Sequence, residues 1–378
     1  MSCVRHLYVH LPFCAHRCGY CDFVTVVGRS GQHRAYVDAV LAEFELERGV
    51  LADEVQTVFL GGGTPTFTEV AELERLLRAL PEAEEVTVEA NPETVTAEVA
   101  ALLRGGGVTR VSLGAQSFQP HLLAVLERQA SPADVRRAVH LLRDAGFDNI
   151  SLDLIYGIPG QSSSDLDSDL AEALTLEPEH LSCYELEAKP GTRFTHAHGE
   201  ELARQADAMD GYFEQVVDTL TAAGYRWYET ANFCVAGGLA RGRDLRARHN
   251  LGYWQGRDYL GLGIGAVSTV AGKRWRNLPS LSRYVASLTA GEEPQREVEP
   301  IDAETRSREL LLLGLRLDEP VAMADVGGAV DRAALSRLVD LGLVERSANG
   351  RGEELRLTRR GRFIGGGVTA ELLELARD

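Results

Sequence analysis

The chain lacks the excess of positive charge that general nucleic-acid binding requires. Its 378 residues include 39 Lys or Arg against 56 Asp or Glu, which gives a formal net charge of −17 at pH 7. Surfaces that bind nucleic acids or anionic membranes need an excess of Lys and Arg. We therefore expect no nucleic acid among the partners of this protein.

Long apolar runs are also missing. Residues 1–9 contain no apolar segment of signal-peptide length, and no other run approaches the length of a membrane span. The six cysteines do not resemble a disulfide framework, because three are clustered and Cys3, Cys183 and Cys234 are scattered. We therefore expect a cytoplasmic protein, and its length allows one large domain and a smaller one.

The clustered cysteines, Cys14, Cys18 and Cys21, stand in the spacing CxxxCxxC after the apolar run of residues 7–11. Three thiolates on one short loop can hold three irons of a cubane 4Fe-4S cluster and leave the fourth iron open for a ligand. A structural zinc site would need a fourth ligand in a closed tetrahedron, and no candidate stands at a usual zinc spacing. These candidates are Cys3, His10 and His16. The spacing thus favours a cluster over zinc or three ordinary thiols.

Up to about residue 190, short apolar or β-branched runs alternate with segments of helical period. The expected strands are residues 7–11, 55–60, 86–90, 110–115, 150–156 and 180–186. The expected helices are residues 36–48, 70–80, 97–104, 121–127, 133–145 and 165–176. Six βα units in series favour a parallel sheet, and a full barrel has eight. The sequence therefore predicts an α/β fold with a partial (β/α)6 barrel of the TIM type.

Glycine-rich and polar segments follow these expected strands at their carboxyl ends, where the chemistry of such folds collects. They are the cysteine loop, Gly61-Gly62-Gly63-Thr64-Pro65, Glu89, Gln116 and Asp153. The glycine run alone is a weak signal, because a βα turn needs glycine anyway. Isolated carboxylates are also more often helix caps or solvated loop residues. Their common position at one edge of the sheet favours ligand binding.

Residues 249–254, with the sequence HNLGYW, combine a histidine that could ligate iron with the flat aromatic surface that a macrocycle needs. A lone histidine beside aromatic residues is more often part of a core. Both interpretations stay open from the residues alone.

The composition changes after residue 300. Residues 304–317 and 333–341 read as helices, and residues 342–346 and 354–357 as a two-stranded wing around Asn349-Gly350. This pattern predicts a small winged-helix-like α+β module, which we interpret as a structural cap or a protein-contact module. We divide the chain into a barrel at 1–235, a linking segment with HNLGYW at 236–295, and this module at 296–378.

A DNA-binding role for the module is the alternative, supported by the arginines near the wing: Arg356, Arg359, Arg360 and Arg362. Residues 296–378 nevertheless carry 13 Arg or Lys against 16 Asp or Glu, a net charge of −3. The charge balance disfavours DNA binding.

The cysteine loop, GGGTP at 61–65, EANP at 89–92 and QSF at 116–118 occur in this order. With them the chain resembles the radical S-adenosylmethionine (radical SAM) superfamily, from about Tyr8 to the carboxyl end. More narrowly, it is similar to the oxygen-independent coproporphyrinogen III oxidases and the related heme chaperones. The resemblance implies a 4Fe-4S cluster on the three cysteines, whose open iron binds the methionine part of S-adenosylmethionine. An electron from the cluster would cleave the sulfonium C–S bond and give a 5′-deoxyadenosyl radical.

The resemblance also implies the residues of two ligand sites. It assigns to S-adenosylmethionine the residues Tyr8, Tyr20, Gly62, Gly63, Thr64, Glu89, Gln116, Arg128 and Asp153. It assigns to heme His249 as axial ligand, with Asn250, Tyr253 and Trp254. Arg128 suits a carboxylate, because its guanidinium is planar and always charged.

Three features favour the heme chaperone branch. The oxidases carry a further Cys two residues after the third ligand, where this chain has Phe23, and a long amino-terminal extension, where only thirteen residues precede Cys14. HNLGYW matches the HNxxYW motif of the chaperones, in which the His is implicated in heme binding. One departure is Val267, because relatives usually have a His in this turn.

We therefore expect a protein that binds the cluster, S-adenosylmethionine and heme, and delivers heme to apo-hemoproteins. The expected partners are heme or porphyrin, the acceptor, and an electron donor if the cluster is reduced; a homodimer and a peripheral membrane contact through the acceptor are left open. Whether the protein is an enzyme is open too. The enzymatic alternatives are oxidative decarboxylation of coproporphyrinogen III and radical methyl transfer, and the third alternative is a DNA-binding regulator.

Overall fold

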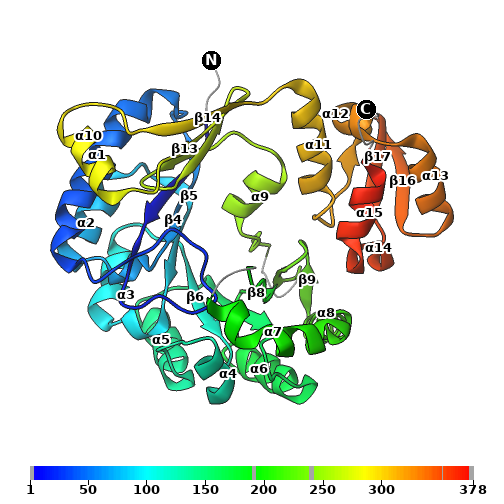
Figure 1. Ribbon diagram of the computed structural model, residues 1–378, viewed down its shortest axis with the longest axis horizontal. Helices are drawn as coiled ribbons and strands as arrows, with labels where there is room; N and C mark the ends of the chain where they lie inside the picture. Colours follow the sequence, from blue (N-terminus) through cyan, green and yellow to red (C-terminus); the bar gives the residue numbers. More distant parts are fainter. Residues whose placement is uncertain (1–3, 190–192, 238–241, 351, 374–378) are drawn as a thin grey trace.

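A computed structural model describes residues 4–189, 193–237, 242–350 and 352–373, so that Cys3 lies outside the described residues. The described chain forms a curved nine-stranded sheet with helices on its outer face, and a separate small module at the carboxyl end (Figure 1). No described helix combines the length and the apolar character that a membrane-spanning helix requires.

The large sheet has the order β11-β1-β4-β5-β6-β7-β8-β10-β9. Its first seven strands are parallel, and β10 and β9 close the other edge in antiparallel pairs. The strands are β1 (His6–Leu11), β4 (Val55–Gly62), β5 (Ala83–Ala90), β6 (Arg110–Gln116), β7 (Ile150–Tyr156), β8 (His180–Glu185), β9 (Tyr225–Trp227), β10 (Asn232–Val235) and β11 (Leu260–Leu262). The predicted partial barrel of parallel strands is confirmed.

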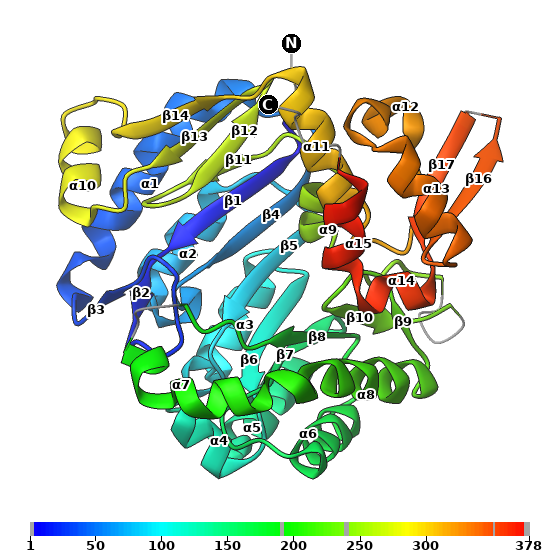
Figure 2. The ribbon, with the colours of Figure 1, turned by 45° about the vertical axis from the view of Figure 1, so that its right-hand side comes forward.

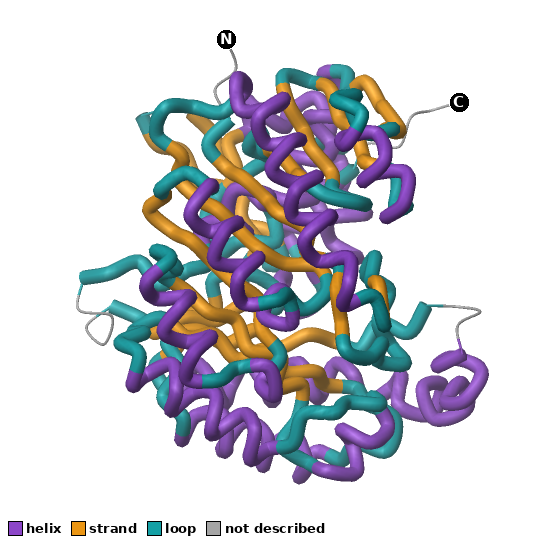
Figure 3. The backbone as a smooth tube through the Cα atoms, turned by 90° about the vertical axis from the view of Figure 1, so that its left-hand side faces the viewer, coloured by secondary structure: helices purple, strands orange, loops and turns teal. Residues whose placement is uncertain are grey.

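Helices cover the convex face of this sheet, and Figure 3 shows one side of the tube with helices lying across the strands. They are α1 (His33–Glu47), α2 (Val70–Ala79), α3 (Ala97–Gly105), α4 (Pro120–Val125), α5 (Pro132–Asp144), α6 (Ser163–Thr175) and α8 (Met209–Ala222). Helix α7 (Arg193–Gln205) packs instead beside the cysteine loop, where Phe194 and Tyr20 belong to one apolar cluster. Capping residues in the sequence mark where two of these helices begin. The Thr96 hydroxyl accepts from Val99 N at the start of α3, and Ser131 forms a capping box with Asp134 at the start of α5.

The segment predicted as a link contributes to the barrel. It holds β11 beside β1 and helix α9 (Arg248–Trp254) inside the curve of the sheet (Figure 2). It also holds α10 (Leu281–Thr289), whose Tyr284 and Leu288 belong to the main core. A three-stranded antiparallel sheet follows from β12 (Val267–Val270), β13 (Lys273–Asn277) and β14 (Arg296–Pro300). The predicted chain divisions at 235 and 295 stay predictions.

The carboxyl-terminal module has its own apolar core, which includes Leu311, Leu338 and Leu355. Its elements are α11 (Ala303–Gly314), β15 (Val321–Ala322), α12 (Met323–Val326), α13 (Arg332–Asp340), β16 (Val344–Asn349), β17 (Gly352–Leu357), α14 (Arg359–Phe363) and α15 (Gly365–Leu372). Strands β16 and β17 form the expected antiparallel wing, with Asn349 opposite Gly352.

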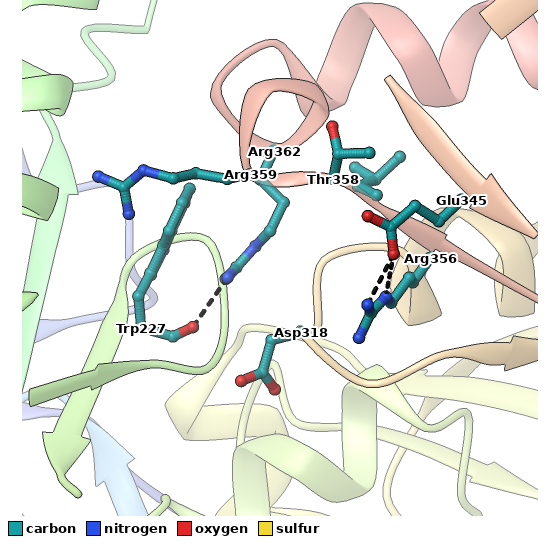
Figure 4. A pocket seen from close by; sticks show the side chains of 8 residues that line it. Trp227, Asp318, Glu345, Arg356, Thr358, Arg359 and Arg362 are labelled. Atoms are coloured by element: carbon teal, nitrogen blue, oxygen red, sulfur yellow. Dashed lines mark hydrogen bonds and ion pairs between the residues drawn. The ribbon is translucent and has the colours of Figure 1, made fainter. Parts of the chain in front are cut away.

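Two of the arginines near the wing, Arg359 and Arg362, contact the barrel, and Arg356 pairs within the wing. A cavity of about 290 Å³ lies between β9 and this module. Figure 4 shows Arg362 directed at the Trp227 carbonyl and Arg356 paired with Glu345. The Arg362 guanidinium lies 3.6 Å from the centre of the Trp227 ring, and Arg359 forms an ion pair with Asp218. These three arginines therefore hold the module against the barrel or pair within the protein.

Candidate functional site

A cavity of about 370 Å³ opens at the carboxyl ends of strands β4 to β8. All three clustered cysteines line it, together with most of the residues expected to bind S-adenosylmethionine. These lining residues are Tyr20, Gly62, Gly63, Thr64, Glu89, Gln116, Arg128 and Asp153. Parallel strands bring their carboxyl ends to one edge, which explains why segments far apart in the sequence meet here.

The cysteine loop is anchored at both ends. Strand β2 (Phe13–Cys14) pairs with β3 (Val26–Val27), so that residues 15–25 form a loop over the edge of the sheet. Inside the loop, Cys21 N donates to Cys18 O, and Arg17 donates to Cys21 O. The three thiols thus come from one braced loop.

A chain of hydrogen bonds connects this loop to the strand ends. Thr64 Oγ1 lies 3.5 Å from Cys14 Sγ and accepts from Asn91 Nδ2 at 2.9 Å. Asn91 Oδ1 accepts from Arg128 Nη2 at 2.9 Å, and Arg128 Nη1 lies 3.6 Å from Cys18 Sγ. Asn91 was not among the site residues predicted from the sequence, although its place directly after β5 was a signal that could have identified it.

Three thiols on one loop supply the donor set of a 4Fe-4S cluster. Among the described residues, no group of three or more His, Cys, Asp or Glu side chains is arranged to hold one metal ion. In a cubane each thiolate binds a different iron, so its ligands stand further apart than the ligands of one ion. Burial raises the pKa of the Cys14 and Cys21 thiols, and iron would supply the positive charge that stabilises their thiolates.

Glycine is required at the end of β4. Gly62 has a φ of +106°, and a Cβ added there would lie 2.3 Å from Cε1 of His10. A Cβ on Gly63 would lie 2.5 Å from the backbone of Pro12. The glycine run therefore lets the backbone of β4 approach the strand that leads into the cysteine loop, beyond what an ordinary βα turn needs.

Two carboxylates, Glu89 and Asp153, face the cavity from neighbouring parts of the sheet. Burial and then the nearby Asp153 raise the pKa of Glu89 to about 7, and burial also raises the pKa of Asp153. Glu89 accepts from Gly62 N at 3.1 Å, and Ser112 donates to Asp153. Such carboxylates can accept hydrogen bonds from ribose hydroxyls or an ammonium group, and a sulfonium charge nearby would favour their ionised forms.

The remaining polar residue, Gln116, ends β6 with a left-handed φ of +66° at a register shift between β6 and β7. Side chains other than glycine adopt this conformation at a cost of about 1 kcal/mol or more. The surrounding sheet therefore holds this side chain in a strained backbone position beside the cavity.

Tyr8 does not line the cavity. Its hydroxyl is hydrogen-bonded to His10 Nδ1 at 3.0 Å, and its ring packs beside the rings of Phe59 and His249, which stack on each other. The structure thus places Tyr8 below the cavity, on the inner face of β1.

The residues expected to bind heme lie on α9, away from the cavity. Only 1% of His249 is exposed, and its Nδ1 and Nε2 are hydrogen-bonded to Thr57 Oγ1 and the Tyr253 hydroxyl at 2.7 and 2.8 Å. Burial lowers the pKa of His249 to about 3. Trp254 packs against Arg316, and Asn250 lies on the same helix.

Val267 begins β12, and the turn before it packs against the cysteine loop. A Cβ on Gly265 would lie 2.8 Å from Cγ2 of Val24, whose carbonyl oxygen is hydrogen-bonded to His10 Nε2. The turn before Val267 therefore lies close to the end of the cysteine loop.

Sequence and structure comparisons agree with this geometry. Residues 8–173 match the family model described as the radical SAM superfamily. The chain is 37% identical to the heme chaperone HemW of Mycobacterium tuberculosis over 97% of this chain and 94% of the relative. It is 32% identical to HemW of Bacillus subtilis over 98% and 99% of the two chains.

Among solved structures, coproporphyrinogen III oxidase (HemN) from Escherichia coli, a radical SAM enzyme, matches with a TM-score of 0.78 and 21% identity. The match covers 98% of this chain and 90% of that one. At this identity the likeness establishes the fold. The end-to-end similarity to HemW proteins confirms the branch predicted from the sequence motifs, and the chain belongs to the HemW family of the radical SAM superfamily.

Proposed function

We propose that this protein is a heme chaperone that binds heme and transfers it to apo-hemoproteins. The observation that carries the proposal is the similarity to HemW proteins along 97% of the chain. We propose further that Cys14, Cys18 and Cys21 hold a 4Fe-4S cluster and that the adjoining cavity holds S-adenosylmethionine. The cluster would supply an open iron and one-electron chemistry.

The chemical groups that line the cavity support the proposed S-adenosylmethionine site. Arg128 offers a guanidinium for a carboxylate, and Glu89 and Asp153 offer acceptors for hydroxyl or ammonium groups. Tyr20, Ile155 and Leu186 supply apolar surface at the same cavity, which suits an adenine ring. Ile155 and Leu186 are two lining residues that sequence motifs did not single out.

His249, the axial ligand that the family resemblance implies, would have to leave its place in the core to bind heme iron. Both of its nitrogens are hydrogen-bonded, and each such bond contributes roughly 1 kcal/mol net to stability. In addition, Glu85 accepts from the backbone N–H groups of Arg248 and His249 at the start of α9. Heme ligation by His249 would therefore require α9 to move away from β4 and β5.

Anaerobic reconstitution with iron and sulfide, followed by two assays of one sample, tests the proposal. Heme titration followed by absorbance should show stoichiometric binding, and added apo-hemoprotein should withdraw the heme. Chromatography of an incubation with coproporphyrinogen III should show no protoporphyrinogen. Product formation would instead assign the chain to the oxidases, and absence of heme binding would refute the chaperone function.

A further inference from the structure

The outer part of the cysteine-lined cavity differs in character from its polar floor. Two segments form this mouth: the cysteine loop supplies His16, Arg17 and Phe23, and the end of β8 with the chain that follows it supplies Tyr184, the penultimate residue of the strand, and Lys189. The polar side chains that suit S-adenosylmethionine belong to the strand ends deeper in the barrel. The side chains of the mouth are therefore available to bind a second ligand.

Two large side chains at the mouth are unusually exposed. Phe23 is 62% exposed and Tyr184 is 42% exposed, and they line the same cavity from opposite segments. The two segments lie close together, because Lys189 Nζ is 3.7 Å from the Asp22 carboxylate. Exposed aromatic rings that share a cavity are suited to a flat apolar ligand, on whose face they can stack.

The same mouth carries an accessible histidine. His16 is exposed, and its ring forms no hydrogen bond or ion pair with any residue that the structure describes. A neutral imidazole nitrogen is a common axial ligand of heme iron. His16 could bind iron without any rearrangement of the core, whereas His249 would first have to break two hydrogen bonds.

Positive charge is also available there for a ligand with carboxylates. Arg17 donates from Nη2 to the Cys21 carbonyl, and its guanidinium has further N–H donors for an anionic group. Lys189 is half-exposed in pairs with Asp22 and Glu187, and exposed pairs of this kind contribute little and exchange readily.

We infer that heme docks at this mouth, with His16 as an axial ligand, Phe23 and Tyr184 against the macrocycle, and Arg17 and Lys189 near its propionates. The inference rests on the proposed heme chaperone function and names the site of that function. A heme held here would lie beside the cluster loop and would cover the cavity below it.

Heme titration of the reconstituted protein tests this site with matched histidine variants. His16→Ala should weaken heme binding by about tenfold or more and shift the Soret band, because iron loses an axial ligand. The control His140→Ala, at an exposed position on α5, should leave both unchanged. His249→Ala should lower thermal stability without shifting the Soret band. Equal iron content in all variants shows that the cluster loop is intact.

Two further readouts address the other parts of the site. Phe23→Ala and Tyr184→Ala should each weaken heme binding by about threefold to tenfold, and Leu341→Ala, which removes an exposed side chain of the distant module, should have no effect. Bound heme should also slow the release of labelled S-adenosylmethionine.

The outcomes separate this site from the function on which it rests. A wild-type protein that binds no heme would overturn both. Heme binding that His16→Ala leaves unchanged and His249→Ala abolishes would overturn the site alone, and would place the ligand on α9.

Discussion

Replacement of Glu89 by Gln should make the ligand-free protein more stable, and increasingly so as the pH rises. The carboxyl group of Glu89 has a pKa of about 7 in the folded chain, raised by burial and then by Asp153 from the usual value of 4.5. A raised folded-state pKa means that the folded protein binds the proton more tightly than the unfolded chain does. Glu89 therefore costs little stability below pH 4.5, and the cost grows until the pH passes 7.

The size of this effect follows from the two pKa values. Between pH 5 and pH 8, linkage gives an added cost of about 2.5 kcal/mol for ionising Glu89 in the folded state. Glutamine removes this cost and can still accept the hydrogen bond from Gly62 N. The stability difference between Glu89→Gln and the wild type should thus grow by about 2.5 kcal/mol over this range.

Urea denaturation of the cluster-free protein at pH 5, 6, 7 and 8 measures this difference. The control Glu214→Gln, at an exposed position on α8, should show a difference that hardly changes with pH. A difference for Glu89→Gln that is equally independent of pH would refute the reasoning. It would mean that Glu89 is not held in an environment that disfavours its charge.

Three further predictions concern the cluster, the glycine run and the hydrogen-bond chain. Cys14→Ala should abolish retention of four irons after anaerobic reconstitution, as iron and sulfide analysis will show, whereas Cys183→Ala should retain them. Gly62→Ala should lose roughly 3 kcal/mol or more in urea denaturation, because its φ is +106° and its Cβ would meet His10, while Gly105→Ala at an open helix end should be neutral or stabilising. Asn91→Ala should lower the free energy of unfolding by about 1–3 kcal/mol and weaken S-adenosylmethionine binding measured by calorimetry, because Thr64 and Arg128 lose a shared partner. Unchanged affinity would show that these hydrogen bonds only stabilise the cysteine loop.

Much of the barrel was predictable because its signals are local. Alternating apolar runs and helical periods predicted the six βα units to within a few residues, and Thr96 and Ser131 cap α3 and α5 through local hydrogen bonds. Strand β11 was not predicted. It has only three residues, Leu260–Leu262, and is fixed by its pairing with β1 rather than by its own sequence pattern.

The candidate site, like the barrel, was predictable where local signals determine it and not where distant side chains do. The residues at strand ends converge as expected, because parallel strands bring their carboxyl ends to one edge whatever lies between them. Asn91 was missed because its role consists of two bonds to side chains, Thr64 and Arg128, that are distant in the sequence. The position of His249 between Thr57 and Tyr253 likewise could not be read from the HNLGYW pattern.

The sequence by itself determined the class of fold, the cysteine ligands expected for a cluster and the family, since these depend on period, spacing and motif order. Only the tertiary structure decided which side chains are accessible. It buried His249 in the barrel and left His16 exposed beside Phe23 and Tyr184. The physical reason is that accessibility depends on how α9 packs inside the curved sheet and how the cysteine loop lies over its edge, and neither arrangement is encoded in local pattern alone.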